Sequence, residues 1–91
     1  MSDEDLNTNN ITIDESGKSV TVRVNPKLYK VHVIMRAADE LIDDNHIIIN
    51  GDPEKSIIVK FISKKDEVTR EELLKTAYEF NTLLVAISGK G

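Results

Sequence analysis

The amino-acid sequence predicts an α+β domain with the element order β-β-α-β-β-α, a two-layer sandwich in which two helices cover one face of a four-stranded, largely antiparallel sheet. Two observations lead to this expectation. Hairpin patterns occur at residues 11–25 and 46–63, and each is followed by a stretch with helical spacing of apolar residues, at about 27–44 and 70–87. Because amphipathic helices and strands must bury their apolar sides, one shared layer interface is the economical arrangement.

Length and composition restrict the class of protein. The 91 residues suffice for one domain, which we expect to span residues 11–88, and a hydrophobic content of 40% is typical of a globular chain. The absence of cysteine excludes disulfides and thiolate metal sites. The formal net charge of −4 disfavours nucleic-acid binding, and no apolar run approaches the roughly 20 residues of a membrane span. We therefore expect a cytoplasmic protein that binds neither nucleic acid nor membrane.

The first ten residues have a different character from the rest. Residues 1–10 contain three neighbouring acidic side chains, Asp3, Glu4 and Asp5, together with three asparagines. This composition favours a disordered acidic tail. The tail is either an interaction arm or a frayed terminus.

The second hairpin has the strongest pattern in the chain. Asn50-Gly51-Asp52-Pro53 is a turn sequence between two runs of β-branched residues. From Ile57 to Ile62 every residue except Lys60 is apolar, so this strand is apolar on both faces. The strand at residues 20–24 instead alternates valine with polar residues, which predicts one buried face. We expect the more apolar second hairpin nearer the centre of the sheet, while the strand order stays open.

Start signals precede both predicted helices. Asn25-Pro26 suits an N-cap followed by the first helical residue, and Thr69 with Glu72 matches the capping box. Gly89 is expected to end the second helix. The apolar positions of the first helix recur every three to four residues, at Leu28, Val31, Ile34 or Met35, Ala38, and Leu41 or Ile42.

Two segments of the chain resemble each other without a gap. Residues 18–24 and 55–61 both begin with Lys-Ser and continue with alternating β-branched residues. Each is the predicted second strand of a hairpin and leads into a predicted helix. An internal duplication and a shared amphipathic pattern both explain the likeness.

The face of the sheet without helices is the candidate functional surface. Strand alternation places Ile48, Ile58 and Ile62 on it, together with Lys60. Three clustered isoleucines expose on the order of a few hundred Å², the range in which apolar patches indicate interaction sites. The sequence therefore predicts a surface that binds a protein or peptide partner. Strand addition at an exposed sheet edge is one available mode of binding. The alternative is a homodimeric structural protein, and coverage of the patch by lysine stems or by the tail is a third explanation.

The end of the first predicted helix is acidic. Asp43 and Asp44 follow Asp39 and Glu40, an arrangement that the helix dipole disfavours. The functional interpretation is that Asp43 and Asp44 dock a basic partner. A solvated helix end is the simpler explanation.

No arrangement of residues is typical of an active site. Asp43-Asp44-Asn45-His46 supplies too few ligands to hold a metal ion by itself, and the four glycines are scattered rather than grouped around a phosphate. His32 lies beside apolar positions and is expected at the boundary of the core. We therefore predict a protein that is not an enzyme, with no catalytic residue, cofactor or metal site.

Residues 28–84 contain a series of mostly apolar motifs: Val33-Ile34-Met35-Arg36-Ala37-Ala38, Leu41-Ile42-Asp43, Ile47-Ile48-Ile49, Ser56-Ile57-Ile58-Val59-Lys60-Phe61, Leu73 and Glu79-Phe80-Asn81-Thr82-Leu83-Leu84. In these motifs the segment resembles the small D-type accessory protein of His-Xaa-Ser peptide-modification systems. Members of that family accompany radical-SAM maturases that act on a repeat-bearing precursor peptide, so the resemblance implies a non-catalytic accessory role. The chain departs from the family at Ser88-Gly89-Lys90-Gly91, where members continue with basic helical residues. The resemblance assigns no site residue.

Overall fold

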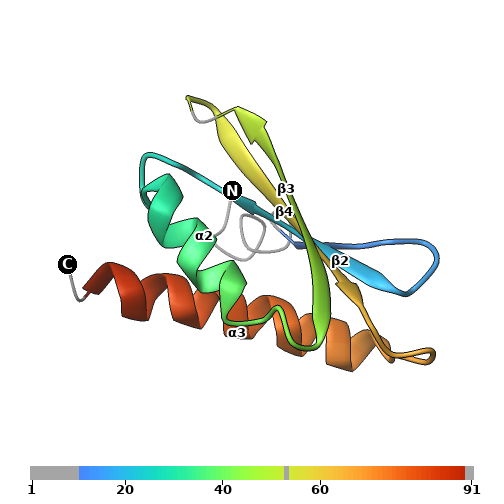
Figure 1. The fold of residues 1–91 in the computed structure, drawn as a ribbon. Coiled ribbons are helices and arrows are strands. Elements are labelled where there is room, and N and C mark those ends of the chain that lie inside the picture. The colour runs from blue at the N-terminus through green and yellow to red at the C-terminus, as the bar shows by residue number, and fades with distance from the viewer. Residues whose placement is uncertain (1–10, 53, 90–91) are drawn as a thin grey trace.

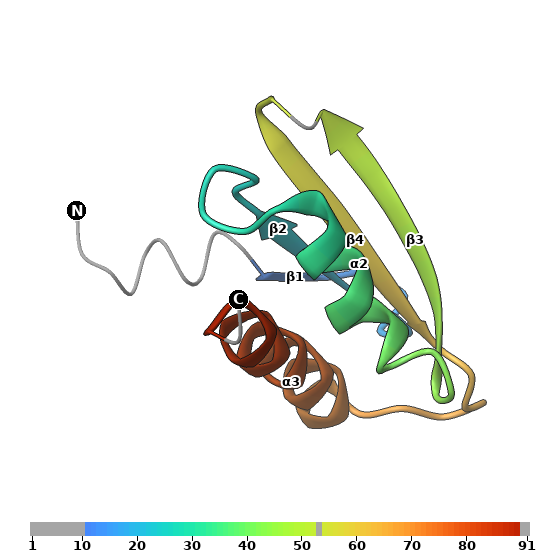
Figure 2. The same cartoon turned by 60° about the vertical axis from the view of Figure 1, so that its left-hand side comes forward.

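The structure, a computed structural model, describes residues 11–52 and 54–89 as a four-stranded sheet with both helices on one side (Figure 1, Figure 2). The predicted α+β class and the order β-β-α-β-β-α are confirmed. The predicted tail at residues 1–10 lies outside the described residues. The elements are β1 (Ile11–Ile13), β2 (Ser19–Val24), α2 (Val31–Asp39), β3 (Asn45–Asp52), β4 (Ser56–Ser63) and α3 (Arg70–Gly89).

The strand order is β1-β2-β4-β3, and all neighbouring strands are antiparallel. Each hairpin therefore contributes one central strand and one edge strand. The expectation that the second hairpin lies nearer the centre as a whole is wrong, because β4 is central but β3 is an edge. The helix-facing side of β3 ends in Gly51, opposite Ile57, so β3 has less side chain to bury than β4 at that end.

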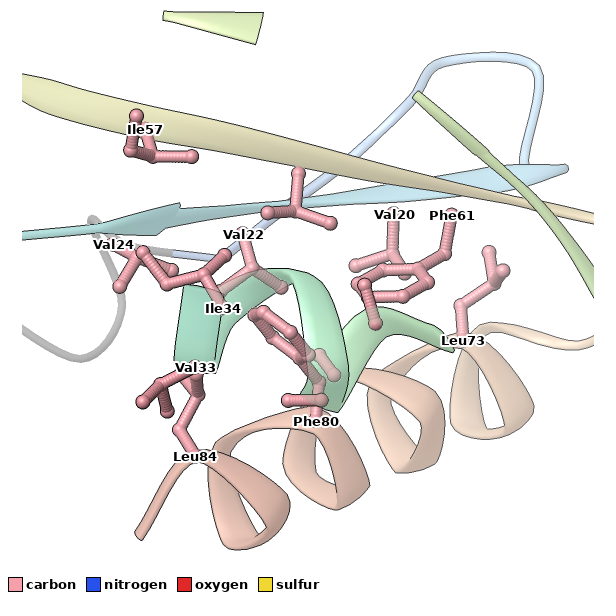
Figure 3. Packing of buried hydrophobic residues seen from close by; sticks show 14 residues of the cluster. Val20, Val22, Val24, Val33, Ile34, Ile57, Phe61, Leu73, Phe80 and Leu84 are labelled. Carbon is pink, nitrogen blue, oxygen red and sulfur yellow. The ribbon is translucent and has the colours of Figure 1, made fainter. Parts of the chain in front are cut away.

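The core fills the space between the sheet and the helices (Figure 3). Phe61 from β4 and Phe80 from α3 are its largest fully buried side chains, and their rings meet edge to face with centroids 5.1 Å apart. The predicted inward residues of β2 and β4 are all buried. The buried apolar residues are Val20, Val22, Val24, Val33, Ile34, Ala37, Ala38, Ile57, Val59, Phe61, Leu73, Ala77, Phe80 and Leu84.

The first helix is shorter than the predicted range of 27–44. The carbonyl oxygen of Asn25 accepts hydrogen bonds from the N–H groups of Leu28 and Tyr29, at 3.0 and 3.2 Å, and so closes a separate turn. Lys30 then has an extended backbone, with φ −63° and ψ 151°. Asn25 therefore starts a helical turn, as the Asn-Pro signal indicates, but Lys30 interrupts it before α2 begins.

The buried side of α2 also differs from the prediction. Val33 and Ala37 are buried, whereas Val31, Met35 and Ile42 are 36%, 55% and 50% exposed. The spacing of apolar residues could not decide between adjacent positions such as 34 and 35. It also did not show that α3 packs against one side of α2, which buries Val33. One side of α2 consequently has apolar side chains that lie outside the core of the domain.

The second helix begins as predicted. The Thr69 hydroxyl accepts a hydrogen bond from the Glu72 N–H at 3.1 Å, and the Glu72 carboxylate accepts one from the Thr69 N–H at 3.3 Å. Lys65 adds an ion pair to Glu72 at 2.6 Å, and its hydrogen bond lowers the pKa of that carboxyl group. Among the described residues, the oppositely charged i,i+4 neighbours Arg36–Glu40 and Glu71–Lys75 do not form ion pairs. No helix in the described ranges has the length and apolar character needed to cross a membrane.

We expect the contact between the two phenylalanines to dominate the stability of the core. Phe80→Ala should lower the free energy of unfolding by about 3–5 kcal/mol, because it removes a buried ring and leaves a cavity. Tyr78→Ala, at an exposed position of the same helix, should cost about 0.5 kcal/mol. Urea denaturation followed by circular dichroism measures both values, and similar losses in the two variants would contradict this account.

Gly51 should not tolerate a side chain. Its φ is +121°, and a Cβ atom would overlap the Ser56 carbonyl oxygen and lie 3.0 Å from the Ile57 Cα atom, both backbone atoms of the paired strand. Gly51→Ala should therefore destabilise the domain by about 2 kcal/mol or more. Gly17→Ala is the matched control, since Gly17 also has positive φ but no atom within 4 Å of the added Cβ. Thermal unfolding should show the larger loss for Gly51→Ala; a reversed order would contradict the steric argument.

Candidate functional site

The face of the sheet opposite the helices has Lys60 of β4 near its centre. The cross-strand partners of Lys60 are Thr21 on β2 and Ile48 on β3. Ile58 and Ile62 are the next residues of β4 on the same face, one on each side of Lys60, because side chains alternate along a strand. Register thus brings the predicted residues together. We call Ile48, Ile58, Lys60 and Ile62 the open-face patch.

The isoleucines of the open-face patch differ in exposure. Ile48, on the edge strand, is 44% exposed, whereas Ile58 and Ile62, on a central strand, are half-buried. Ile58, for example, lies between Arg23 of β2 and Asn50 of β3. The neighbouring strands therefore cover part of the apolar surface that the sequence predicts, and the patch has a polar border.

Lys60 gives the open-face patch a positive charge. Its side chain is half-buried, and its register places the aliphatic stem between the isoleucines. The pKa of Asp14, in the turn after β1, is lowered, mainly by a 2.6 Å hydrogen bond from the Ser16 hydroxyl and to a smaller extent by the charge of Lys60. The patch therefore offers apolar contacts around one cation, with a carboxylate nearby.

Asp43 and Asp44 lie elsewhere. Both are exposed in the turn between α2 and β3, beyond the end of the strand rather than on the open face. The Asp44 carbonyl oxygen accepts a hydrogen bond from the Lys64 N–H at 3.0 Å. The Asp44 charge also helps to raise the pKa of Lys65, after the larger effect of Glu72. The Asp44 charge thus lies near Lys65, and both aspartates are separate from the open-face patch.

Within the segment Asp43-Asp44-Asn45-His46, Asn45 has a structural role. Asn45 is buried, and its side-chain amide donates a hydrogen bond to the Leu41 carbonyl oxygen at 3.2 Å, at the end of the turn that follows α2. His46 and His32 are both exposed. Over residues 11–52 and 54–89, no group of three or more His, Cys, Asp or Glu side chains is placed to hold a metal ion.

Two shallow depressions of about 710 Å³ each border α3. Leu41, Leu74 and Leu83 are among the residues that line the first, and Ile11 and Val85 among those that line the second. Neither depression includes a residue of the open-face patch. The first lies between the end of α2 and α3, and the second between the sheet and α3. The charged residues that border the first depression are all exposed, as expected of a solvated rim: Glu40, Glu71, Lys75 and Glu79.

Sequence reasoning missed an apolar surface on the helix side of β3. Val31, Met35 and Ile42 are exposed along α2 and the turn after it, and Ile49, on the helix-facing side of β3, is 37% exposed. We call these four residues the α2–β3 flank. The signal for it was present in the sequence: adjacent apolar pairs such as Ile34-Met35 cannot both face one core.

Comparisons of the chain with protein-family models, with curated proteins and with solved structures find no match. The resemblance to accessory proteins of His-Xaa-Ser systems is not tested by them and stays a prediction.

Proposed function

We propose that this chain is a small, non-enzymatic accessory or adaptor domain of the cytoplasm that binds a protein or peptide partner through the open-face patch. The supporting observation is that both helices lie on one side of the sheet (Figure 2). The strand register places isoleucines around a lysine on the other side. An apolar surface around a single charge favours recognition by shape and by one complementary charge.

The chemistry of the patch suggests the kind of segment that it binds. Ile48, Ile58 and Ile62 would contact apolar side chains, and the ammonium group of Lys60 would pair with a carboxylate of the partner. Because two of the isoleucines are half-buried, the apolar area gained is modest. We infer a weak or transient complex, the class that buries less than about 1,200 Å² in total.

The biological setting follows from the family resemblance alone. In a peptide-modification system, the partner would be a precursor peptide or the radical-SAM maturase that acts on it. Such a role needs no catalytic residue, cofactor or metal in this chain. Asp43 and Asp44 would add a second, electrostatic contact if the partner is basic.

Substitution of the open-face patch should release the partner. Ile58→Lys places a charge in the patch, so recovery of the partner in affinity capture should fall at least about tenfold, which corresponds to about 1.4 kcal/mol. Val85→Lys is the control, because Val85 is 62% exposed on α3, outside the patch. Circular dichroism verifies that both variants fold. Equal recovery with Ile58→Lys and wild type would exclude the open face as the binding surface.

The acidic pair is tested separately. The double substitution Asp43→Lys and Asp44→Lys should weaken a basic partner at low salt and have less effect at high salt, because screening shortens the range of exposed charges. Titration of the captured partner at two salt concentrations measures this. An affinity that stays unchanged at low salt would remove Asp43 and Asp44 from the binding surface.

A further inference from the structure

β3 is an edge strand of eight residues with β4 as its only neighbour among the described strands. The direction of its main-chain groups follows from two hydrogen bonds. The Lys64 N–H donates to the Asp44 carbonyl oxygen on the β3 side, and the Ser63 N–H donates to the Lys18 carbonyl oxygen on the β2 side, both at 3.0 Å. Because this direction alternates along a strand, even-numbered residues of β3 bond to β4, and odd-numbered ones direct their N–H and C=O groups to the free edge.

The free edge of β3 lacks the usual protection against strand pairing. Natural edge strands are commonly short or carry lysine or proline. β1, at the opposite edge, has three residues in the described part of the chain, whereas β3 has neither lysine, arginine nor proline from Asn45 to Asp52. Ile47 and Ile49 therefore present unpaired main-chain groups beside apolar side chains.

The order of residues in β3 fits a second copy of the same strand. His46-Ile47-Ile48-Ile49-Asn50 has the same sequence of polar and apolar residues in both directions. A two-fold interface requires such self-complementarity, because the same surface of both copies forms it: where one residue contacts a second residue of the other copy, the reverse contact also occurs. With Ile48 on the axis, Ile47 lies opposite the second copy's Ile49, and His46 opposite the second copy's Asn50. No two acidic or two basic residues face each other within this segment. Like charges meet only beyond its two ends, where Asp52 comes opposite the second copy's Asp44.

The α2–β3 flank points toward the same axis. Val33 packs on the α3 side of α2, close to Leu84 (Figure 3). Met35 is two residues further along, about 200° around the helix, and therefore projects away from α3. In Figure 2, α2 lies between α3 and the edge formed by β3. Pairing of two β3 edges would bring two such flanks together beneath the joined strands and bury them.

We propose that two copies of this chain form a dimer in which the β3 strands pair antiparallel about a two-fold axis at Ile48 and the α2–β3 flanks pack against each other. The two sheets become one, and their open-face patches become neighbours. At about 3.3 Å per residue β3 spans about 26 Å. The strand and the flank together offer several hundred Å² per copy, which is somewhat less than the roughly 800 Å² per partner that is typical of stable interfaces. We therefore expect a dissociation constant in the micromolar range.

Sedimentation equilibrium of the full chain tests the dimer. Over about 10–200 µM wild type should show a monomer–dimer equilibrium, and Met35→Lys and Ile49→Lys should each raise the dissociation constant at least about tenfold. Val85→Lys, which adds the same charge at an exposed site on α3, should dimerise as wild type does. Ile58→Lys should also dimerise as wild type does, so loss of the dimer and loss of the adaptor function are distinguishable. A wild type that stays monomeric, or a dimer that neither variant weakens, would overturn the proposal. A monomer whose captured partner is lost on Ile49→Lys would assign the edge to a partner strand instead.

Single cysteines test the axis, since the native chain has none. In the proposed register Ile48 faces itself in a non-hydrogen-bonded pair, with Cα atoms about 4.5 Å apart, within reach of a disulfide. Ile48→Cys should therefore form a covalent dimer with oxidised glutathione. Asn50→Cys, on the same face, lies about 13 Å from its counterpart and should not. Non-reducing electrophoresis separates the products, and equal cross-linking of both variants, or of neither, would exclude this register.

Discussion

The antiparallel contact between β2 and β4 is the constraint on which the rest of the structure depends. Each hairpin, with the helix that follows it, is a unit of local contacts, and this contact joins the two units in one sheet. At its middle Val22 pairs with Val59, and both are fully buried. Because the apolar sides of both strands face the same way, both helices must cover that side, and the opposite side is left to Lys60 and its neighbours.

The likeness between residues 18–24 and 55–61 has a geometric counterpart. In the gapless alignment Val22 corresponds to Val59, and these residues are paired with each other in the sheet. The two segments are therefore related by a local two-fold axis through that pair. A duplicated unit and two similar amphipathic units both lead to this symmetry. In either case the domain consists of two β-β-α halves that bury one common core.

The predictable and unpredictable features have different physical origins. Alternation along a strand determines which residues share a face, so the core side of β4 and the open-face patch could be assigned from sequence. Alternation does not determine which strands are neighbours, so the edge position of β3 and the half-burial of Ile58, which lies beside Arg23 and Asn50, could not. Helical spacing likewise left Ile34 and Met35 equivalent until the contact between α2 and α3 distinguished them.

The two edges of the sheet differ in their resistance to local opening. Within the described residues, β1 pairs with β2 through three residues, whereas β3 pairs with β4 through eight. Detachment of β1 disrupts few main-chain hydrogen bonds and leaves the buried contact between the hairpins intact, so its free-energy cost lies far below that of global unfolding. Amide protons of β2 that face β1 therefore exchange with solvent through this subglobal fluctuation, while those between β2 and β4 exchange only when the whole domain unfolds.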